Sequence, residues 1–314
     1  MRFGIGVEIG GTKLQVGIGS GGSELTGRCR KKVDPTGGAQ GILQELSGMV
    51  PELLQDTGIS RSDVAGVGIG FGGPVDSKRG YTLVSHQIEG WDSFPLQEWA
   101  QEQWGFPTSI QNDASLAGYA EAIAGAGKGC ERVFYMTIGS GIGGGWIHQG
   151  IIDEGQGLGA AEIGHNWVPN PVTGKPEKLE WVCSGWSIGK RAVEYLESGK
   201  PSAITNLVNG NLEGISAEIV YRAAEMDDPL ALTVLGETCE TLGLAIANVF
   251  ALLHPEKVII GGGVSLMGDL FWERLRDAIG RRMFGPFRDS WCIAKAALGE
   301  DVVVVGGVLL ALSG

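Results

Sequence analysis

The sequence predicts an α/β fold in two similar halves built on one plan. Apolar, β-rich segments alternate with segments of helical spacing along the whole chain, which is typical of folds in which strands and helices take turns. Glycine turns directly follow three of the strand-like segments, in VEIGGTK, MTIGSGIGGG and VIIGGGVS. Because 314 residues exceed what one small core needs, we expect one large or two medium domains.

The expected elements follow from local patterns. A strand, a tight turn and a second strand are expected over 3–18, a helix over 40–56 and a buried strand over 64–71. Next come a short helix at 96–104, a strand at 108–111, a helix of small residues at 114–126, a strand at 132–138 and a returning strand at 146–151. The last are helices at 187–198, 216–226, 229–253 and 270–284, a strand entering a glycine turn at 257–265, and a tail from 302 that is a strand or, preferably, a helix packed through Gly306 and Gly307. We place a candidate hinge at 111–114.

Composition and charge narrow the function classes. The net charge is −12, and the only basic run, Arg28–Lys32, suits a solvated strand end or turn, so we expect no nucleic-acid partner. The start of the chain lacks the apolar segment of a signal peptide. The longest apolar stretch, 302–312, is short for a membrane span of roughly 20 residues. Five dispersed cysteines indicate reduced thiols, so we expect a cytoplasmic protein without membrane contact.

The glycine turns allow two interpretations. Each turn alone is most simply a plain hairpin, yet a glycine turn after a strand also exposes backbone N–H groups that bind phosphate. G-x-G-x-x-G occurs at Gly139, Gly141 and Gly144, but a strand-like segment follows and Asp153 comes too early for a dinucleotide fold. The sequence holds no Walker A loop. Together the turns favour a nucleotide, with two nests on its phosphates and the third near its base or ribose.

A second set of candidates is polar. Asn112 and Asp113 stand between a strand and a helix, and Asp113, directly before the expected helix, suits an N-cap or a functional carboxylate. Glu162 and His165 follow a glycine-rich loop, three residues apart, and Glu180 comes soon after. This pattern suits a metal site, a helix-surface pair or a set of groups that bind adjacent sugar hydroxyls, because buried hydroxyls need hydrogen-bond partners.

These motifs occur in one order along most of the chain, and with them the chain resembles the ROK family of sugar kinases and sugar-responsive repressors. The resemblance implies the actin-like (ribonuclease H-like) ATPase fold, with two domains and a central cleft. The matching segments are VEIGGTK (7–13), GIGFGGPVD (68–76), IEGWDSFPL (88–96), QNDASLAGYAE (111–121), TIGSGIGGGWIHQGIIDEGQGLGAAEIGH (137–165), LEWVCSG (179–185) and NVFALLHPEKVIIGGGVS (248–265). The run GSGIGGG followed by EIGH is specific to that family.

The resemblance implies a role for each matching residue, with Asp113 as the general base on the attacking hydroxyl. The residues implied to bind ATP are Gly10, Gly11, Thr12, Lys13, Gly139, Ser140, Gly141, Gly261, Gly262 and Gly263. Those implied to bind the sugar are Gly73, Asn112, Glu162, His165 and Glu180. The small N-terminal domain would comprise 1–112 with about 300–314, and the large C-terminal domain 113–299.

Two single-residue departures from the family pattern bear on ligands. Glu8 stands where the family usually has Asp, as in the fructokinase branch; the carboxylate is kept, so we expect Mg²⁺ to bind near Glu8 through the nucleotide. The family's Asn before the GW turn is Gln87 or is shifted, which leaves the identity of the sugar open.

The third departure concerns a metal. The family has a zinc-binding cysteine cluster between the residues matching His165 and Glu180, and this chain has no cysteine there. Cys183 lies beyond Glu180 and is out of register as a ligand. A structural zinc needs four ligands, so we predict no zinc. The proline-rich loop NWVPNPVTGKPEKL (166–179) and Trp167 or Trp181 are expected to take over the packing role of the cluster.

The leading hypothesis is an ATP-dependent hexose kinase that phosphorylates the 6-hydroxyl of glucose. Fructose, mannose and N-acyl hexosamines are alternative substrates, and polyphosphate is an alternative donor. A repressor would need an N-terminal helix-turn-helix domain of roughly 70 residues, for which this sequence has no room before Glu8. A non-catalytic sugar- or nucleotide-binding protein is the third alternative, and the retained Asp113 argues against it. Members of the family are often dimers, so we expect a homodimer by analogy.

Overall fold

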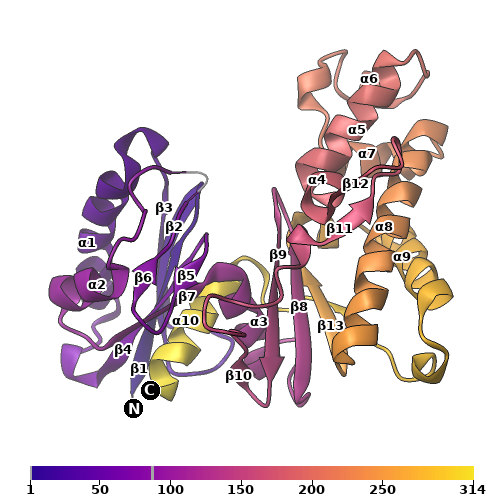
Figure 1. Cartoon of the computed structure of the whole chain (residues 1–314). Coiled ribbons are helices and arrows are strands. Elements are labelled where there is room, and N and C mark those ends of the chain that lie inside the picture. Colours follow the sequence, from indigo (N-terminus) through magenta and orange to yellow (C-terminus); the bar gives the residue numbers. More distant parts are fainter. Residues whose placement is uncertain (1, 86–87) are drawn as a thin grey trace. The chain divides into compact units, whose positions relative to one another are not determined.

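The computed structural model describes residues 2–85 and 88–314, which form two compact units (Figure 1). The first unit comprises Met1–Tyr135, Gly145–Ala161 and Ala296–Gly314, and the second comprises Met136–Gly144 and Glu162–Lys295. By this division 113–135 and 145–161 belong to the first unit. The domain boundaries expected from the sequence place them in the large domain, and those boundaries stay a prediction.

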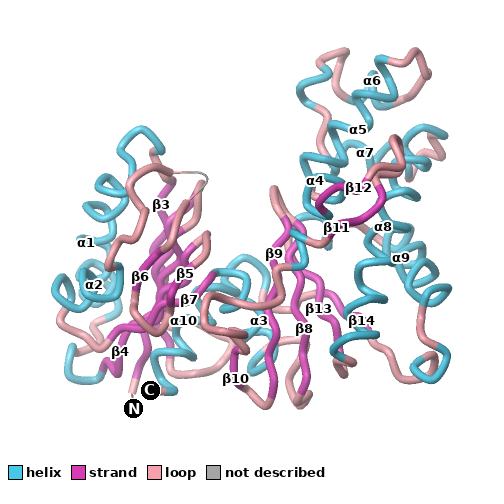
Figure 2. Tube along the Cα trace, viewed as in Figure 1, coloured by secondary structure: helices cyan, strands magenta, loops and turns pink. Residues whose placement is uncertain are grey.

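The first unit is built on a five-stranded sheet with the order β3-β2-β1-β4-β7; strands are drawn in magenta in Figure 2. Its strands are β1 (Phe3–Ile9), β2 (Lys13–Gly19), β3 (Gly27–Lys32), β4 (Val64–Phe71) and β7 (Thr108–Asn112). β1 runs antiparallel to β2 and parallel to β4, which runs parallel to β7. In register, Ile9 lies opposite Phe71, and Phe71 opposite Asn112. The carboxyl ends of three parallel strands therefore meet at one edge, the usual place for a ligand site in such sheets.

The two faces of this sheet are covered differently. Ile5 and Val7 of β1 belong to the apolar core that also contains Leu46 of α1. Because successive strand residues point to opposite faces, Gly4 and Gly6 lie on the other face, against the C-terminal helix. The remaining elements of this unit are α1 (Gly38–Thr57), β5 (Val75–Asp76), β6 (Tyr81–Thr82), α2 (Leu96–Trp104), α3 (Asp113–Ala124), β10 (Ile151–Ile152) and α10 (Val302–Ser313).

α10 approaches the sheet so closely that only glycine fits beneath it. A Cβ on Gly6 would lie 1.9 Å from the Val304 carbonyl oxygen, and one on Gly68 would lie 2.2 Å from that of Gly307. Any side chain at these positions would push the helix away. The expectation that the tail is a helix packed through Gly306 and Gly307 is confirmed.

A second five-stranded sheet has the order β10-β9-β8-β13-β14. β8 (Arg132–Ile138) and β9 (Ile142–His148) have residues in both units, and β13 (Lys257–Gly261) pairs in parallel with β14 (Ile293–Lys295). The other elements of the second unit are β11 (Trp167–Pro169), β12 (Pro176–Lys178), α4 (Leu179–Cys183), α5 (Gly185–Glu197), α6 (Ile204–Leu207), α7 (Ala217–Ala224), α8 (Pro229–Leu253) and α9 (Asp269–Arg282). Short 3₁₀ turns lie along the chain at 35–37, 61–63, 163–165, 212–214, 263–266, 285–287 and 299–301.

α8 is the central helix of the second unit, and α4, α5, α7 and α9 pack against it (Figure 1). Among the described residues, α8 alone is long and apolar enough to cross a membrane. Of the most apolar stretch of α8, 67% is buried inside the protein, which is typical of a core helix.

The returning strand of the second sheet begins earlier than the sequence indicates. β9 starts at Ile142 and includes the glycine run that reads as a loop, whereas a strand is expected only from 146. A Cβ on Gly145 would lie 2.9 Å from the Ser115 Cα. The glycines therefore let α3 pack directly on the strand, and a glycine-rich sequence folds as a strand because its partner is so near.

The basic run at 28–32 is a full edge strand, β3, rather than a strand end or turn. Two of its arginines are ion-paired with acids that precede α10. Arg28 Nη1 lies 2.6 Å from Asp301 Oδ2, and Arg30 Nη1 lies 2.6 Å from Glu300 Oε2. Charged side chains on an edge strand also oppose pairing with other chains.

Candidate functional site

The first glycine turn joins β1 to β2 at the carboxyl edge of the first sheet. The Gly10 N–H donates to the Lys13 carbonyl oxygen at 3.1 Å, and the Val33 N–H donates to that of Thr12 at 3.0 Å. These bonds fix a tight turn in which Thr12 is exposed to solvent. All four residues expected to contact phosphate, Gly10, Gly11, Thr12 and Lys13, are thus brought to one accessible turn.

An ion pair lies directly beside this turn. Lys13 Nζ is 3.2 Å from Glu8 Oε2. Burial raises the pKa of Glu8 to about 7, although Lys13 lowers it, and the Asp113 carboxylate adds to the rise. The charge of Asp113 therefore acts on Glu8. The first unit has two carboxylates, Glu8 and Asp113, and one ammonium group, Lys13, near the ends of its strands.

Asn112 and Asp113 are neighbours in the sequence, but their side chains make different contacts. Asn112, the last residue of β7, is the N-cap of α3: its Oδ1 accepts from the Ser115 N–H at 3.1 Å. The N-cap reading of Asp113 is therefore wrong by one residue. The Asn112 amide also donates to the Gly73 carbonyl oxygen at 3.1 Å. Asp113 Oδ1 accepts from the Ala114 N–H at 2.7 Å, and a Cβ on Gly72 would lie 3.5 Å from Asp113 Oδ2. The two glycines keep the backbone after β4 close to this pair.

The second unit carries the other polar candidates, Glu162, His165 and Glu180. Glu162 is the N-cap of a 3₁₀ turn (Ile163–His165) that ends at His165, and both side chains are exposed to solvent. A Cβ on Gly164 would lie 2.1 Å from the Ile142 carbonyl oxygen, so this turn is pressed against the start of β9. Loss of hydration raises the pKa of Glu162; the charge of His165 lowers it and that of Glu180 raises it. The three side chains therefore share one electrostatic neighbourhood.

The second glycine turn, 139–141, lies in this same unit and is held from both ends. Glu180 Oε2 accepts from the Ile142 N–H at 2.8 Å, and the Gly185 N–H donates to the Gly139 carbonyl oxygen at 2.7 Å. Within the turn, the Gly139 N–H donates to the Gly141 carbonyl oxygen at 2.9 Å. Glu180, expected among the sugar ligands, thus contacts the backbone that follows a phosphate turn.

A cavity of about 770 Å³ opens beside this turn. Gly139, Ser140 and Gly263 line it, so the second and third glycine turns meet at one cavity. Gly261 and Gly262 are not among its lining residues; Gly262 has φ of +80°, and its Cβ would lie 2.5 Å from the Ile138 carbonyl oxygen. Its other lining residues come from the start of α5 (Gly185 and Trp186), from α7 and the two residues before it (Ile215, Ser216, Ala217, Glu218 and Tyr221), and from the 3₁₀ turn after β13 and the residue that follows it (Val264, Leu266 and Met267).

These α5 and α7 residues are the part of the site that motif reasoning missed. Trp186, 49% exposed, directly follows the LEWVCSG segment, and an exposed tryptophan beside a suspected ligand motif is a usable signal. Glu218 and Tyr221 stand in an ordinary amphipathic helix. Nothing in their spacing distinguishes them from other helix residues.

The segment between His165 and Glu180 forms the β11–β12 hairpin. Asn170 closes its turn: Nδ2 donates to Glu177 Oε2 at 2.6 Å, and Oδ1 accepts from the Val172 and Thr173 N–H groups at 2.9 and 3.0 Å. The side chain that packs inward is Val168, at 3% exposure.

The expected tryptophans do not take that packing role. Trp167 is 67% and Trp181 is 48% exposed. Over residues 2–85 and 88–314, no three His, Cys, Asp or Glu side chains are grouped to hold a metal ion. Cys183 faces α8, and burial raises its pKa to about 12. These residues do not fit a zinc site, and the absence of zinc stays a prediction. Gln87 lies outside the described residues.

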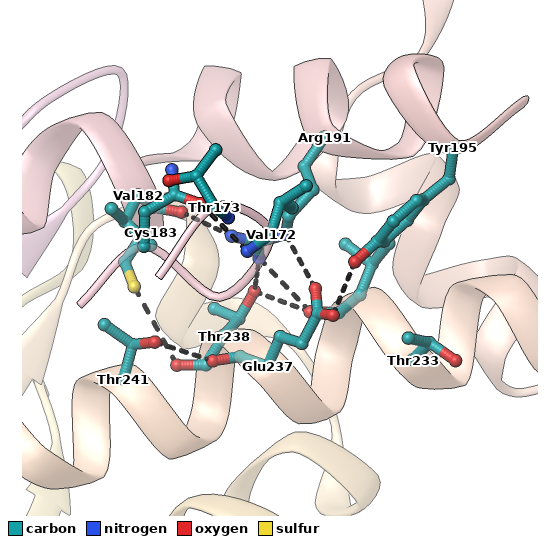
Figure 3. A network of polar contacts seen from close by, with 12 residues as sticks. Val172, Thr173, Val182, Cys183, Arg191, Tyr195, Thr233, Glu237, Thr238 and Thr241 are labelled. Atoms are coloured by element: carbon teal, nitrogen blue, oxygen red, sulfur yellow. Dashed lines mark hydrogen bonds and ion pairs between the residues drawn. The ribbon is translucent and has the colours of Figure 1, made fainter. Parts of the chain in front are cut away.

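A buried polar network fixes α4 and α5, which carry Glu180 and Gly185, onto α8 (Figure 3). Arg191 donates to the Val182 carbonyl oxygen at 3.0 Å and to the Thr238 hydroxyl, and its Nε lies 3.2 Å from Glu237 Oε2. The Tyr195 hydroxyl donates to Glu237 Oε1 at 2.6 Å. One buried guanidinium thereby ties three helices together.

Comparison with known proteins agrees with this architecture. The model of the ROK family matches residues 4–313. The chain is 31% identical to a glucokinase of Halalkalibacterium halodurans, over 98% of this chain and 94% of that protein. It is 28% identical to a glucokinase of Thermotoga maritima, over 96% and 95%. The crystal structure of a ROK family glucokinase from Streptomyces griseus, in complex with glucose and AMPPNP, superposes with a TM-score of 0.83 at 30% identity, over 99% of this chain and all of that one. The expected α/β, actin-like ATPase fold is confirmed, and the chain belongs to the ROK family.

Proposed function

We propose that this chain transfers the γ-phosphoryl group of ATP to the 6-hydroxyl of glucose, with Asp113 as the general base. The broader assignment, an ATP-dependent hexose kinase, follows from its nearly full-length relationship to glucokinases. The observation that supports Asp113 as the general base lies in the first unit. There Asn112 caps α3, and this leaves Asp113 to a site that also holds Glu8, Lys13 and the first glycine turn.

The proposed reaction moves one proton and one phosphoryl group. Asp113 takes the proton of the 6-hydroxyl while that oxygen bonds to the γ-phosphorus. The bond from the γ-phosphorus to the oxygen it shares with the β-phosphate breaks, and ADP leaves with the electron pair. Such transfers depend mainly on positioning and charge stabilisation.

We assign the remaining groups by their place in each unit. The turn from Gly10 to Lys13 and the turn 139–141 hold the phosphates through backbone N–H groups. The cavity beside Gly263 takes the adenosine, since its volume and its Trp186 and Tyr221 rings suit a purine nucleoside. The assigned hexose ligands are Gly73, Asn112, Glu162, His165 and Glu180.

Mg²⁺ accompanies the nucleotide in this proposal, and Glu8 is the residue that suits it. Glu8 is a buried carboxylate next to the first phosphate turn; burial raises its pKa to about 7, and the ion pair with Lys13 lowers it only in part. A hard cation prefers such oxygen ligands. When bound, it neutralises charge on the phosphate oxygens.

Glucose is the preferred substrate because the protein of known structure that binds it is 30% identical over nearly the whole chain. Fructose, mannose and N-acyl hexosamines are the alternative acceptors, and polyphosphate is the alternative donor. We also propose a cytoplasmic homodimer without membrane or nucleic-acid partners.

A coupled ADP-release assay tests the function. Purified protein with Mg-ATP is offered glucose, fructose, mannose, N-acetylglucosamine and N-acetylmannosamine. Glucose is expected to give the highest kcat/KM, with product phosphorylated at the 6-position. A higher kcat/KM for another sugar would replace the substrate. Binding of sugar and AMPPNP by calorimetry without any turnover would favour the non-catalytic alternative.

A further inference from the structure

Glu180 contacts the backbone of the second phosphate turn, which a sugar ligand has no need to do. Its Oε2 accepts from the Ile142 N–H at 2.8 Å, one residue after Gly141. A Cβ on Gly141 would lie 2.6 Å from the same oxygen. Glycine at 141 is therefore what allows the carboxylate to come this close. A hydrogen bond from a backbone N–H to a carboxylate is also stronger than one between neutral groups.

The segment that carries Glu180 also holds the other end of the turn. The Gly185 N–H donates to the Gly139 carbonyl oxygen at 2.7 Å, and a Cβ on Gly185 would lie 3.0 Å from that oxygen. Glu180 and Gly185 thus hold the two ends of the turn, from the start of α4 and the start of α5 respectively.

The segment from Glu180 to Gly185 is itself held in place by hydrogen bonds. The Glu180 carbonyl oxygen accepts from the Ser184 N–H at 3.1 Å and from the Ser187 hydroxyl at 3.0 Å. Arg191, 5% exposed, donates to the Val182 carbonyl oxygen two residues further on (Figure 3). The Glu180 backbone is therefore anchored to α5 and α8. Its side chain, through the bond to the Ile142 N–H, fixes turn 139–141 relative to these helices.

We propose that Glu180 is a positioning residue for the nucleotide: its carboxylate holds turn 139–141 in the conformation that binds phosphate. The inference rests on the proposed role of that turn. It goes beyond a role in sugar binding, because it requires Glu180 to affect nucleotide affinity when no sugar is present. The charge of Glu180 also raises the pKa of Glu162, another proposed hexose ligand of the same unit, so in this proposal one carboxylate serves both substrates.

The test is calorimetry of AMPPNP with Mg²⁺ in the absence of sugar, on Glu180→Ala and Glu180→Gln. The Ala variant is expected to bind roughly tenfold to a hundredfold more weakly, the range of one lost hydrogen bond to a charged acceptor. The Gln variant is expected to stay within about twofold, because its amide oxygen accepts from the Ile142 N–H as the carboxylate does. Hexose affinity is expected to fall in both. Unchanged AMPPNP affinity in Glu180→Ala would overturn the proposal.

A second variant disrupts the same contact by changing the turn and not Glu180. It provides an independent test in case the Glu180 variants misfold. Gly141→Ala leaves Glu180 in place but puts a Cβ where its Oε2 lies, and it is expected to weaken AMPPNP binding to a similar extent. Adding Glu180→Ala to it should cost less than the sum of the two losses, since both break one contact. Strictly additive losses would contradict the shared contact.

The matched control is Glu177→Ala, which removes a carboxylate three residues away that bonds Asn170 in the hairpin. Its AMPPNP affinity is expected to equal that of the parent. Because AMPPNP is not turned over, the result is independent of whether any sugar is phosphorylated. Failure of the kinase assignment would therefore be seen separately, in the ADP-release assay.

Discussion

The two units contribute sites of opposite character. In the first, Glu8, Lys13 and Asp113 form a charged cluster at the carboxyl edge of the sheet, and burial raises the pKa of Glu8 to about 7. In the second, a wide cavity is lined largely by apolar groups and glycine backbone, and a single carboxylate, Glu180, holds the turn beside it. Proton transfer demands controlled ionisation, whereas nucleotide binding demands shape and backbone donors. Single substitutions in each unit test this difference.

The largest effect is expected from Asp113→Asn. An amide cannot accept the hydroxyl proton, so kcat should fall about 10²–10⁴-fold, while thermal stability stays near that of the parent. Steady-state kinetics and a thermal melt check both. Asp56→Asn, at an exposed position in α1, is the matched control. A loss of tenfold or less in Asp113→Asn would remove it as the base.

The next effect concerns the frame of the second unit. Arg191→Ala leaves the partly buried Glu237 without its ionic partner, although the Tyr195 hydroxyl still donates to it, and removing one member of a buried ion pair costs about 3–5 kcal/mol of unfolding free energy. Urea unfolding measures it. Lys190→Ala, which removes an exposed pair with Glu194, should change stability by less than about 0.5 kcal/mol. Equal losses in the two variants would refute a bracing role for Arg191.

Glu8 should make stability depend on pH. Its folded pKa, about 7, lies above the ordinary 4.5, so the protonated form is favoured by folding. The stability it contributes is complete below about pH 4.5 and is lost as pH rises to about 7. Glu8→Gln cannot ionise. Its stability relative to the parent should therefore grow over this window, by roughly 3 kcal/mol. Urea unfolding at pH 5 and pH 8 tests this, and a difference that does not change with pH would contradict it.

The smallest effect is expected at the cavity of the second unit. Trp186→Ala removes an aromatic face that lines it, so the KM for ATP should rise roughly tenfold, with kcat and the KM for hexose nearly unchanged. Trp167→Ala, on the hairpin and 67% exposed, is the control of the same residue type. A rise confined to the hexose KM would place the nucleotide elsewhere.

The sequence predicted the strand ends and the long helices of the second unit well, but it did not predict that residues of α5 and α7 line the cavity. The turns after β1 and β13 and the helix α10 packed through Gly306 and Gly307 follow from local patterns of glycine and apolar residues. The N-cap at Asn112 differs from expectation by one residue, because two neighbouring polar side chains satisfy the same preference.

Other features could not be read from local patterns. The glycine run of β9 becomes a strand only through its packing on α3, a contact distant in sequence. The contribution of Glu218 and Tyr221 to the cavity, and the bond from Glu180 to Ile142, likewise depend on segments that fold together from far apart.

The most direct test of the account is a double comparison of Asp113→Asn and Trp186→Ala, in which AMPPNP affinity and kcat at saturating ATP are measured on the same preparations. If catalysis and nucleotide binding are divided as proposed, Asp113→Asn keeps its AMPPNP affinity and loses turnover, while Trp186→Ala keeps its turnover and loses AMPPNP affinity. If both quantities fell together in both variants, catalysis and nucleotide binding would not be divided between these two sets of residues.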